Sequence, residues 1–128
     1  MLFQHVAIAG LAHIDAPRQL TSAEINARLK PTLDRLGIKA NVLEDIAGIR
    51  SRRLWDDGVE ASDAATLAGV KALADAGIDP SRIGLLVNTS VSRDYLEPST
   101  ASIVCGNLGL SDTCQIFDVA NACLAFLN

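Results

Sequence analysis

The chain has 128 residues, a length that suits one domain. Hydrophobic residues make up 49% of it and charged residues 20%, a globular composition that excludes a disordered chain. The formal net charge of −4 excludes a protein that binds nucleic acid non-specifically, because such binding needs a basic face.

Hydropathy and cysteine usage favour a cytoplasmic protein. The longest apolar run, residues 6–12, is far shorter than the roughly 20 residues that a membrane-spanning helix needs. No signal peptide is visible, since no Lys or Arg precedes Arg18. The three cysteines are an odd number without a CxxC pair, which argues against a disulfide framework and for a reducing compartment.

The first half of the chain alternates strand and helix signals. Residues 5–11 (HVAIAGL) are short and apolar, as a buried strand should be. Thr21 and Glu24 form a capping-box pattern, which predicts a helix to about residue 29. Pro31 is expected to open a second helix that ends near residue 37. Residues 41–47 suit one more short helical turn, and residues 48–55 alternate as a strand does.

The second half has clearer signals. In chain order it predicts a helix that Ser62 or Asp63 caps and that ends at Gly77, a buried strand over 83–89, a helix over 98–108, a strand over 115–120 and a helix from residue 124. Strands separated by helices indicate an α/β fold, with a βαβαβ order, a mostly parallel sheet and helices on both faces. The last helix would have only one or two turns, so we expect residues 1–128 to be one domain truncated just after Cys123.

Cys123 is the first candidate for chemistry. It follows a predicted strand and opens a predicted helix, where the helix dipole favours a thiolate and backbone N–H groups can face an oxyanion. This order of strand, turn and helix is that of a nucleophile elbow. A buried, inert cysteine in an alanine-rich segment is the alternative. The remaining cysteines, Cys105 and Cys114, suit packing, and their spacing matches no zinc motif.

Four other residues are candidates. Glu97 precedes Pro98, so it suits either a helix cap or a general base in a desolvated pocket. Arg50, Arg52 and Arg53 could bind a phosphate-bearing substrate or lie on a solvated strand edge. Neither GxGxxG nor GxxxxGK[ST] occurs, which leaves a nucleotide cofactor without support.

Several segments together resemble the thiolase superfamily. They are GIxxRR at residues 48–53, IGLLVNTS at 83–90 and DVANACLAF at 118–126. The ketoacyl-ACP synthase III branch is the most similar. Within that branch, IAGLAHIDAP at 8–17 and SRDYLEPST at 92–100 resemble the enzymes that begin long-chain olefin biosynthesis in bacteria. The resemblance implies the N-terminal half of a thiolase-like fold.

The resemblance also implies a reaction. Cys123 would accept a fatty acyl group from acyl-CoA, and Glu97 would remove the α-proton of a second acyl-CoA, reaching across a homodimer. The product of this non-decarboxylative Claisen condensation would be a 2-alkyl-3-oxoacyl-CoA. The family uses no metal and no redox cofactor, and coenzyme A enters only as part of the substrate. The family's catalytic His and Asn belong to its second half, and neither His5, His13 nor Asn128 matches them.

Three alternatives stay open. A 3-oxoacyl-ACP synthase III of fatty-acid biosynthesis would condense acyl-CoA with malonyl-ACP by decarboxylation. A non-catalytic fragment or a subunit of a split enzyme would use its unfinished surface as an interface. A redox-sensing thiol protein would oxidise Cys123 without acylating it.

Overall fold

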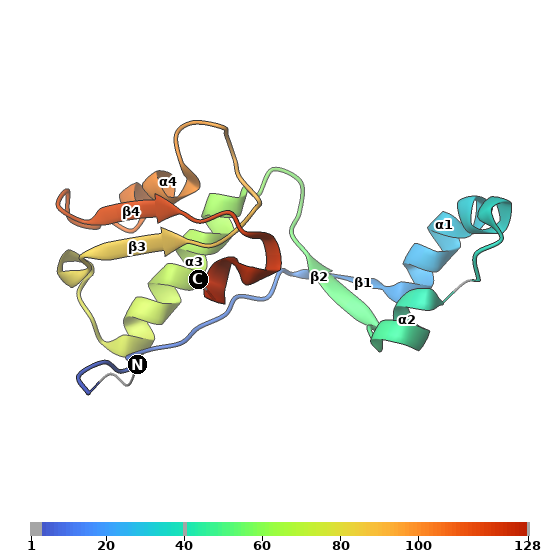
Figure 1. Ribbon diagram of the computed structural model, residues 1–128, viewed down its shortest axis with the longest axis horizontal. Helices are drawn as coiled ribbons and strands as arrows, with labels where there is room; N and C mark the ends of the chain where they lie inside the picture. Colours follow the sequence, from blue (N-terminus) through green and yellow to red (C-terminus); the bar gives the residue numbers. More distant parts are fainter. Residues whose placement is uncertain (1–3, 40, 128) are drawn as a thin grey trace. The chain divides into compact units, whose positions relative to one another are not determined.

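The computed structural model describes residues 4–39 and 41–127. The chain divides into two compact units, one of Met1–Ile14 with Val59–Asn128 and one of Asp15–Gly58. Figure 1 shows the helices and strands of both units. None of the helices in the described ranges combines the length and the apolar character that crossing a bilayer requires.

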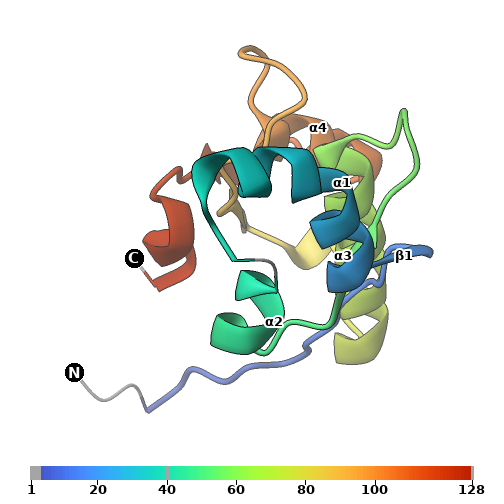
Figure 2. The same cartoon turned by 90° about the vertical axis from the view of Figure 1, so that its right-hand side faces the viewer.

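The Asp15–Gly58 unit is built on a two-stranded antiparallel sheet. Strand β1 (Arg18–Thr21) pairs with β2 (Ser51–Leu54) in the register Arg18 to Leu54, and helix α1 (Ser22–Leu36) follows β1 directly. Helix α2 (Val42–Ala47) is held to α1 by the amide of Asn26, which donates to Asn41 Oδ1 at 2.9 Å. Both views place α1 above α2 (Figure 2).

The other unit contains a parallel β–α–β arrangement beside a long helix. Helix α3 (Ala61–Ala76) and the short 3-10 helix η1 (Pro80–Arg82) lead into β3 (Leu85–Asn88). Helix α4 (Thr100–Asn107) then returns the chain to β4 (Gln115–Asp118), which pairs with β3 in parallel. A 3-10 helix, η2 (Ala122–Leu127), follows β4. This unit confirms the α/β class.

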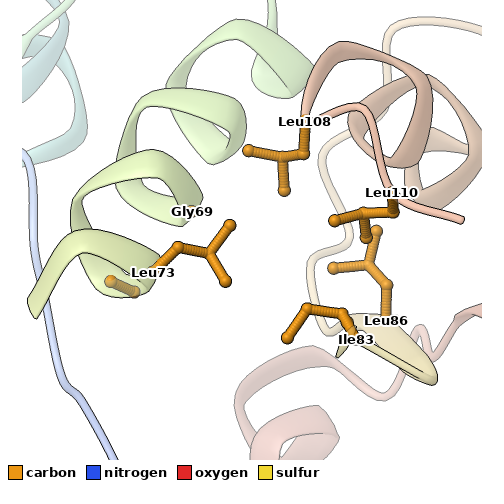
Figure 3. A pocket seen from close by; sticks show the side chains of 7 residues that line it. Gly69, Leu73, Ile83, Leu86, Leu108 and Leu110 are labelled. Atoms are coloured by element: carbon orange, nitrogen blue, oxygen red, sulfur yellow. The ribbon is translucent and has the colours of Figure 1, made fainter. Parts of the chain in front are cut away.

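Helices α3 and α4 pack closely because Gly69 leaves room for a neighbouring side chain. A Cβ at position 69 would lie 2.9 Å from Cδ1 of Leu108. Beside this contact lies a small cavity of about 180 Å³ between α3, β3 and the end of α4 (Figure 3). Only apolar residues line it: Gly69, Ala72, Leu73, Ile83, Leu86, Leu108 and Leu110.

The prediction of a buried strand at residues 5–11 is wrong. Residues 6–11 have no regular secondary structure, and Val6 and Ile8 are 72% and 90% exposed. The segment instead runs along α3, where the backbone N–H of Leu11 donates to Asp75 Oδ2 at 3.1 Å (Figure 1). The N–H group of Leu11 therefore has a hydrogen-bond partner on a helix side chain and not on a neighbouring strand.

The prediction of two helices around Pro31 is also wrong, since α1 runs unbroken through it. Pro31 has no N–H group, so the helix lacks the hydrogen bond that residue 31 would donate to the carbonyl of Ala27. Ala27 and Pro31 are exposed, so water can donate to that carbonyl instead. The expected sheet differs as well. Among the described residues, β1 and β2 pair antiparallel and only β3 and β4 pair in parallel. Strand β3 is not fully buried, because Leu85 is 54% exposed.

The remaining predicted boundaries agree well with the structure. The capping box at Thr21 and Glu24 is present, and α3 ends at Gly77, whose φ of 63° is left-handed. The predicted cap of α3 is displaced, because Glu60 is the N-cap residue and Ser62 lies inside the helix. Strands β2 and β4 and helix α2 lie within the predicted segments.

Candidate active site

Cys123 lies in a sharp turn just after β4. The chain leaves the strand through Val119, whose N–H donates to Asn88 O at 2.9 Å. Ala122 then has a φ of 45°, a left-handed conformation that a residue with a Cβ rarely adopts. Cys123 is the second residue of η2, and its thiol is free and exposed. The expected order of strand, sharp turn and helix is present, with a 3-10 helix in place of an α-helix.

The parallel pairing of β3 and β4 brings two loops to one edge of the sheet. Both strands end at that edge, so residues 89–99 and residues 119–122 leave it together (Figure 1). A cavity of about 500 Å³ opens there. It is lined by both strand ends and by η2, through Val87, Thr89, Val119, Ala125 and Phe126. Cys123 does not line this cavity itself, but Ala125 and Phe126 of the same 3-10 helix do.

Glu97 lies in the 89–99 loop and is exposed. It does not cap α4, because Ser99 is the N-cap residue and its Oγ accepts from the N–H of Ser102 at 3.2 Å. The loop is also held at Asp94, whose Oδ1 accepts from the N–H of Ser62 at 3.1 Å. Within residues 4–39 and 41–127, no hydrogen bond joins Glu97 to Cys123.

The three arginines have different partners. Arg50 is 88% exposed and lies 3.8 Å from Glu44 Oε1. Arg52 donates from Nη2 to Ser22 Oγ at 3.5 Å, and Arg53 donates from Nη1 to Pro17 O at 3.3 Å. Each side chain therefore has its own partner, and a joint role in binding phosphate stays a prediction.

Cys105 and Cys114 differ from Cys123 in their surroundings. Both are partly buried. Burial raises the pKa of the Cys105 thiol, and the neighbouring Cys114 raises it further through charge and a hydrogen bond. A raised pKa lowers the fraction of reactive thiolate that Cys105 has at neutral pH. No group of three His, Cys, Asp or Glu residues that could hold a metal occurs in the described part of the chain.

Asp118 is not among the site residues predicted from the sequence, although its carboxylate accepts three hydrogen bonds at this edge of the sheet. It is the last residue of β4, and its carboxylate accepts from the N–H groups of Thr100 and Ala101 and from the amide of Asn88. An aspartate at the end of a predicted strand is a weak signal by itself, because its partners depend on how β4 and α4 pack.

Comparison with known proteins gives strong matches. The Xanthomonas campestris acyl-CoA:acyl-CoA alkyltransferase is 74% identical over 128 residues, all of this chain and 38% of that protein. The Shewanella oneidensis protein of the same name is 39% identical over 128 residues. These residues are all of this chain and 37% of that protein. The chain thus spans well under half of the curated relatives that it matches. No family model matches it.

Solved structures agree in fold. A 3-oxoacyl-(acyl carrier protein) synthase III from Xanthomonas oryzae superposes with a TM-score of 0.93 at 74% identity, over all of this chain and 38% of that one. Cerulenin-bound OleA from X. campestris superposes with a TM-score of 0.92 at 74% identity, and the match covers 100% of this chain and 37% of that one. Other OleA structures carry substitutions of a glutamate, a cysteine or a histidine. That glutamate and cysteine are separated by as many residues as Glu97 and Cys123, whereas the histidine lies well beyond the matched segment.

Proposed function

We propose a function from one premise, that this chain belongs to the ketoacyl-ACP synthase III-like branch of the thiolase superfamily and forms the N-terminal part of its fold. The protein that carries it joins two fatty acyl-CoA molecules by a Claisen condensation. This assignment follows the names of two curated relatives, both acyl-CoA:acyl-CoA alkyltransferases, whose similarity extends over all of this chain.

The observation that carries the proposal is the placement of Cys123. Its exposed thiol follows a strained residue, Ala122, at the sheet edge where an apolar cavity opens. Backbone strain at such a turn is typical of functional sites. The matching separation of Glu97 and Cys123 with the residues substituted in OleA supports their assignment as a pair.

The proposed reaction has two steps. In the first, the Cys123 thiolate attacks the carbonyl carbon of an acyl-CoA, a thioester bond to Sγ forms, the bond to the coenzyme A sulfur breaks, and coenzyme A leaves as its thiolate. In the second, the Glu97 carboxylate takes a proton from the α-carbon of another acyl-CoA. The carbanion attacks the acyl carbon on Sγ, the Cys123 thiolate leaves, and a 2-alkyl-3-oxoacyl-CoA is released. These two steps need no metal ion and no redox cofactor, and the prediction that the protein uses neither remains a prediction.

Intact mass spectrometry tests the first step. Incubation of the full-length protein with myristoyl-CoA should add one acyl group, and Cys123→Ser should abolish the adduct while Cys114→Ser retains it. Glu97→Ala should keep the adduct but lose condensation product, because deprotonation follows acylation. Loss of acylation in Glu97→Ala would contradict the assigned role, and oxidation of Cys123 without acylation would favour the redox-sensing alternative.

A decarboxylating synthase is the second candidate, because a 74% identical neighbour carries the name 3-oxoacyl-(acyl carrier protein) synthase III. Loss of CO2 would generate the carbanion there, so no carboxylate base is required. Malonyl-ACP offered with acyl-CoA separates the two functions. Condensation that releases CO2 and survives Glu97→Ala would favour the synthase.

The substrate, the assembly and the location complete the proposal. Acyl-CoA is the proposed substrate, a homodimer the proposed assembly and the cytoplasm the proposed location. A non-catalytic fragment or split-enzyme subunit is the remaining alternative. It would be favoured if neither acyl-CoA nor malonyl-ACP left an adduct on the full-length protein.

A further inference from the structure

The carboxylate of Asp118 connects two chain segments that the proposed reaction uses. Asp118 ends β4, and the chain reaches Cys123 five residues later. Its Oδ2 accepts from the N–H of Thr100 at 2.9 Å, and its Oδ1 accepts from the N–H of Ala101 at 2.8 Å. These are the first two residues of α4, and Glu97 lies three residues before that helix begins.

The donors make this connection costly to break. Thr100 and Ala101 are 1% and 0% exposed, so their N–H groups would lose their partners without access to water. The negative carboxylate also complements the positive end of α4. Ser99 satisfies the next N–H group, that of Ser102, so Asp118 and Ser99 together complete the first turn of the helix.

Asn88 holds the carboxylate in place from the neighbouring strand. It pairs with Asp118 in the register of β3 and β4, and its Nδ2 donates to Asp118 Oδ1 at 3.1 Å. The backbone carbonyl of Asn88 also accepts from Val119, the first residue after β4. The ends of both strands and the start of α4 are therefore joined through one side chain.

We infer that Asp118 is a positioning residue, which anchors both the segment that carries Glu97 and the turn that carries Cys123, so that each side chain reaches the site in which it acts. This inference rests on the proposed function. The carboxylate of Asp118 acts on the backbone of these segments, because its oxygens accept hydrogen bonds from the N–H groups of Thr100 and Ala101. Misplacement of a reacting group by about 1 Å can cost roughly 100-fold in rate.

The variant Asp118→Asn tests the inference in the full-length protein. An amide keeps one acceptor oxygen and turns an NH2 group toward the backbone donors, so one of the two helix bonds is lost. We expect acylation of Cys123 by myristoyl-CoA to persist, while kcat for condensation per acylated site falls by about tenfold or more at an unchanged KM. The matched control is Asp112→Asn, which removes a carboxylate from the loop before β4 and should leave kcat and KM unchanged.

A second variant keeps the test decisive if Asp118→Asn does not fold. Asn88→Ala removes only the 3.1 Å bond to Asp118 and should lower the same kcat by a smaller factor. A normal kcat per acylated site in every folded variant would overturn the inference, because Asp118 would then only stabilise the fold.

Hydrogen exchange separates failure of the inference from failure of the proposed function. If Asp118 joins the two segments, exchange in Asp118→Asn should rise together at residues 97–101 and 119–123. This readout needs no turnover, so it holds even if the wild-type protein forms no acyl-Cys123. A rise confined to one segment would overturn the inference.

Discussion

The thiols of one unit differ in their exposure, and the pKa of one of them is raised. Cys123 is exposed, whereas burial raises the pKa of Cys105 above its ordinary value of 9.0 and Cys114 raises it further. The thiolate is the reactive form of cysteine, so a raised pKa lowers reactivity at neutral pH. Reaction with an alkylating reagent should therefore distinguish these residues without any substrate.

We expect iodoacetamide at pH 8 to label Cys123 first and Cys105 last. The difference should narrow as the pH rises, because more of the Cys105 thiol then ionises. Trypsin cannot separate the sites, since no Lys or Arg follows Arg93 in this chain. A protease that cuts before aspartate can, because Asp112 and Asp118 place the three cysteines in different peptides. Labelling of Cys105 as fast as Cys123 at pH 8 would contradict the prediction.

At the scale of elements, the N-terminal segment depends on close contact with α3. A Cβ at Gly10 would lie 2.9 Å from the backbone O of Ala72 and 2.9 Å from both N and Cβ of Ala76. Two of those atoms belong to the helix backbone, which cannot move aside as a flexible side chain can. Lys71 adds a hydrogen bond from its Nζ to His13 O at 3.1 Å.

Gly10→Ala should therefore destabilise the protein by about 1–3 kcal/mol, the range found for overpacking. The measurement is urea unfolding at equilibrium. Gly84→Ala is the matched control, since nothing lies within 4 Å of a Cβ there. It should change stability by less than about 0.5 kcal/mol. Equal effects at the two positions would show that the segment does not pack on α3 as described.

The first turn of α1 is stabilised by a carboxylate. Glu24 Oε2 accepts from Thr21 Oγ1 at 2.6 Å and from the N–H of Thr21 at 2.8 Å. These two bonds lower the pKa of Glu24 below 4.5. A group whose pKa is lowered on folding adds stability above its unfolded pKa and loses it as the pH falls through the folded value.

Glu24→Gln should accordingly lower the midpoint of urea unfolding at pH 7, and the difference from the wild type should shrink as the pH falls below 4.5. Asp34→Asn on the same helix is the control. It removes an exposed ion pair with Lys30, which should contribute little at either pH. A difference that persists unchanged at pH 3 would contradict the assigned role of the carboxylate.

The sequence predicts most elements because their signals are local. The capping box before α1 and the left-handed Gly77 after α3 each involve a few neighbouring residues. The predictions for residues 5–11 and for Pro31 were wrong for different reasons. The conformation of residues 5–11 depends on contacts with α3, which is distant in sequence, and the continuity of α1 through Pro31 depends on exposure to water. An apolar run gives no information on whether a strand or a helix will satisfy its N–H groups.

For the molecule as a whole, the candidate site was predictable only in part. The turn at Cys123 follows from its local sequence, and pairing it with Glu97 depends on the family resemblance. The role of Asp118 could not be predicted, because its donors lie 17 and 18 residues away and meet it only once β4 packs against α4. The separate partners of Arg50, Arg52 and Arg53 likewise depend on β1–β2 pairing and on side-chain reach.

The proposed homodimer makes a prediction at the largest scale. If Glu97 acts in the site of the partner subunit, a mixed dimer of Glu97→Ala and Cys123→Ala holds one complete site. Its intact thiol then faces the intact glutamate of the other subunit. Each variant alone should be inactive, and co-expression should restore condensation in the mixed dimer to about half of the wild-type rate per dimer, one working site out of two.

Two differently tagged subunits allow that mixed dimer to be purified before its rate is measured. A mixed dimer of wild type and Cys123→Ala is the control, and it should also retain about half of the activity. If Glu97 acts within its own subunit, the doubly mutant mixture stays inactive although this control works. That result would keep the proposed chemistry and reject the sharing of the site between subunits.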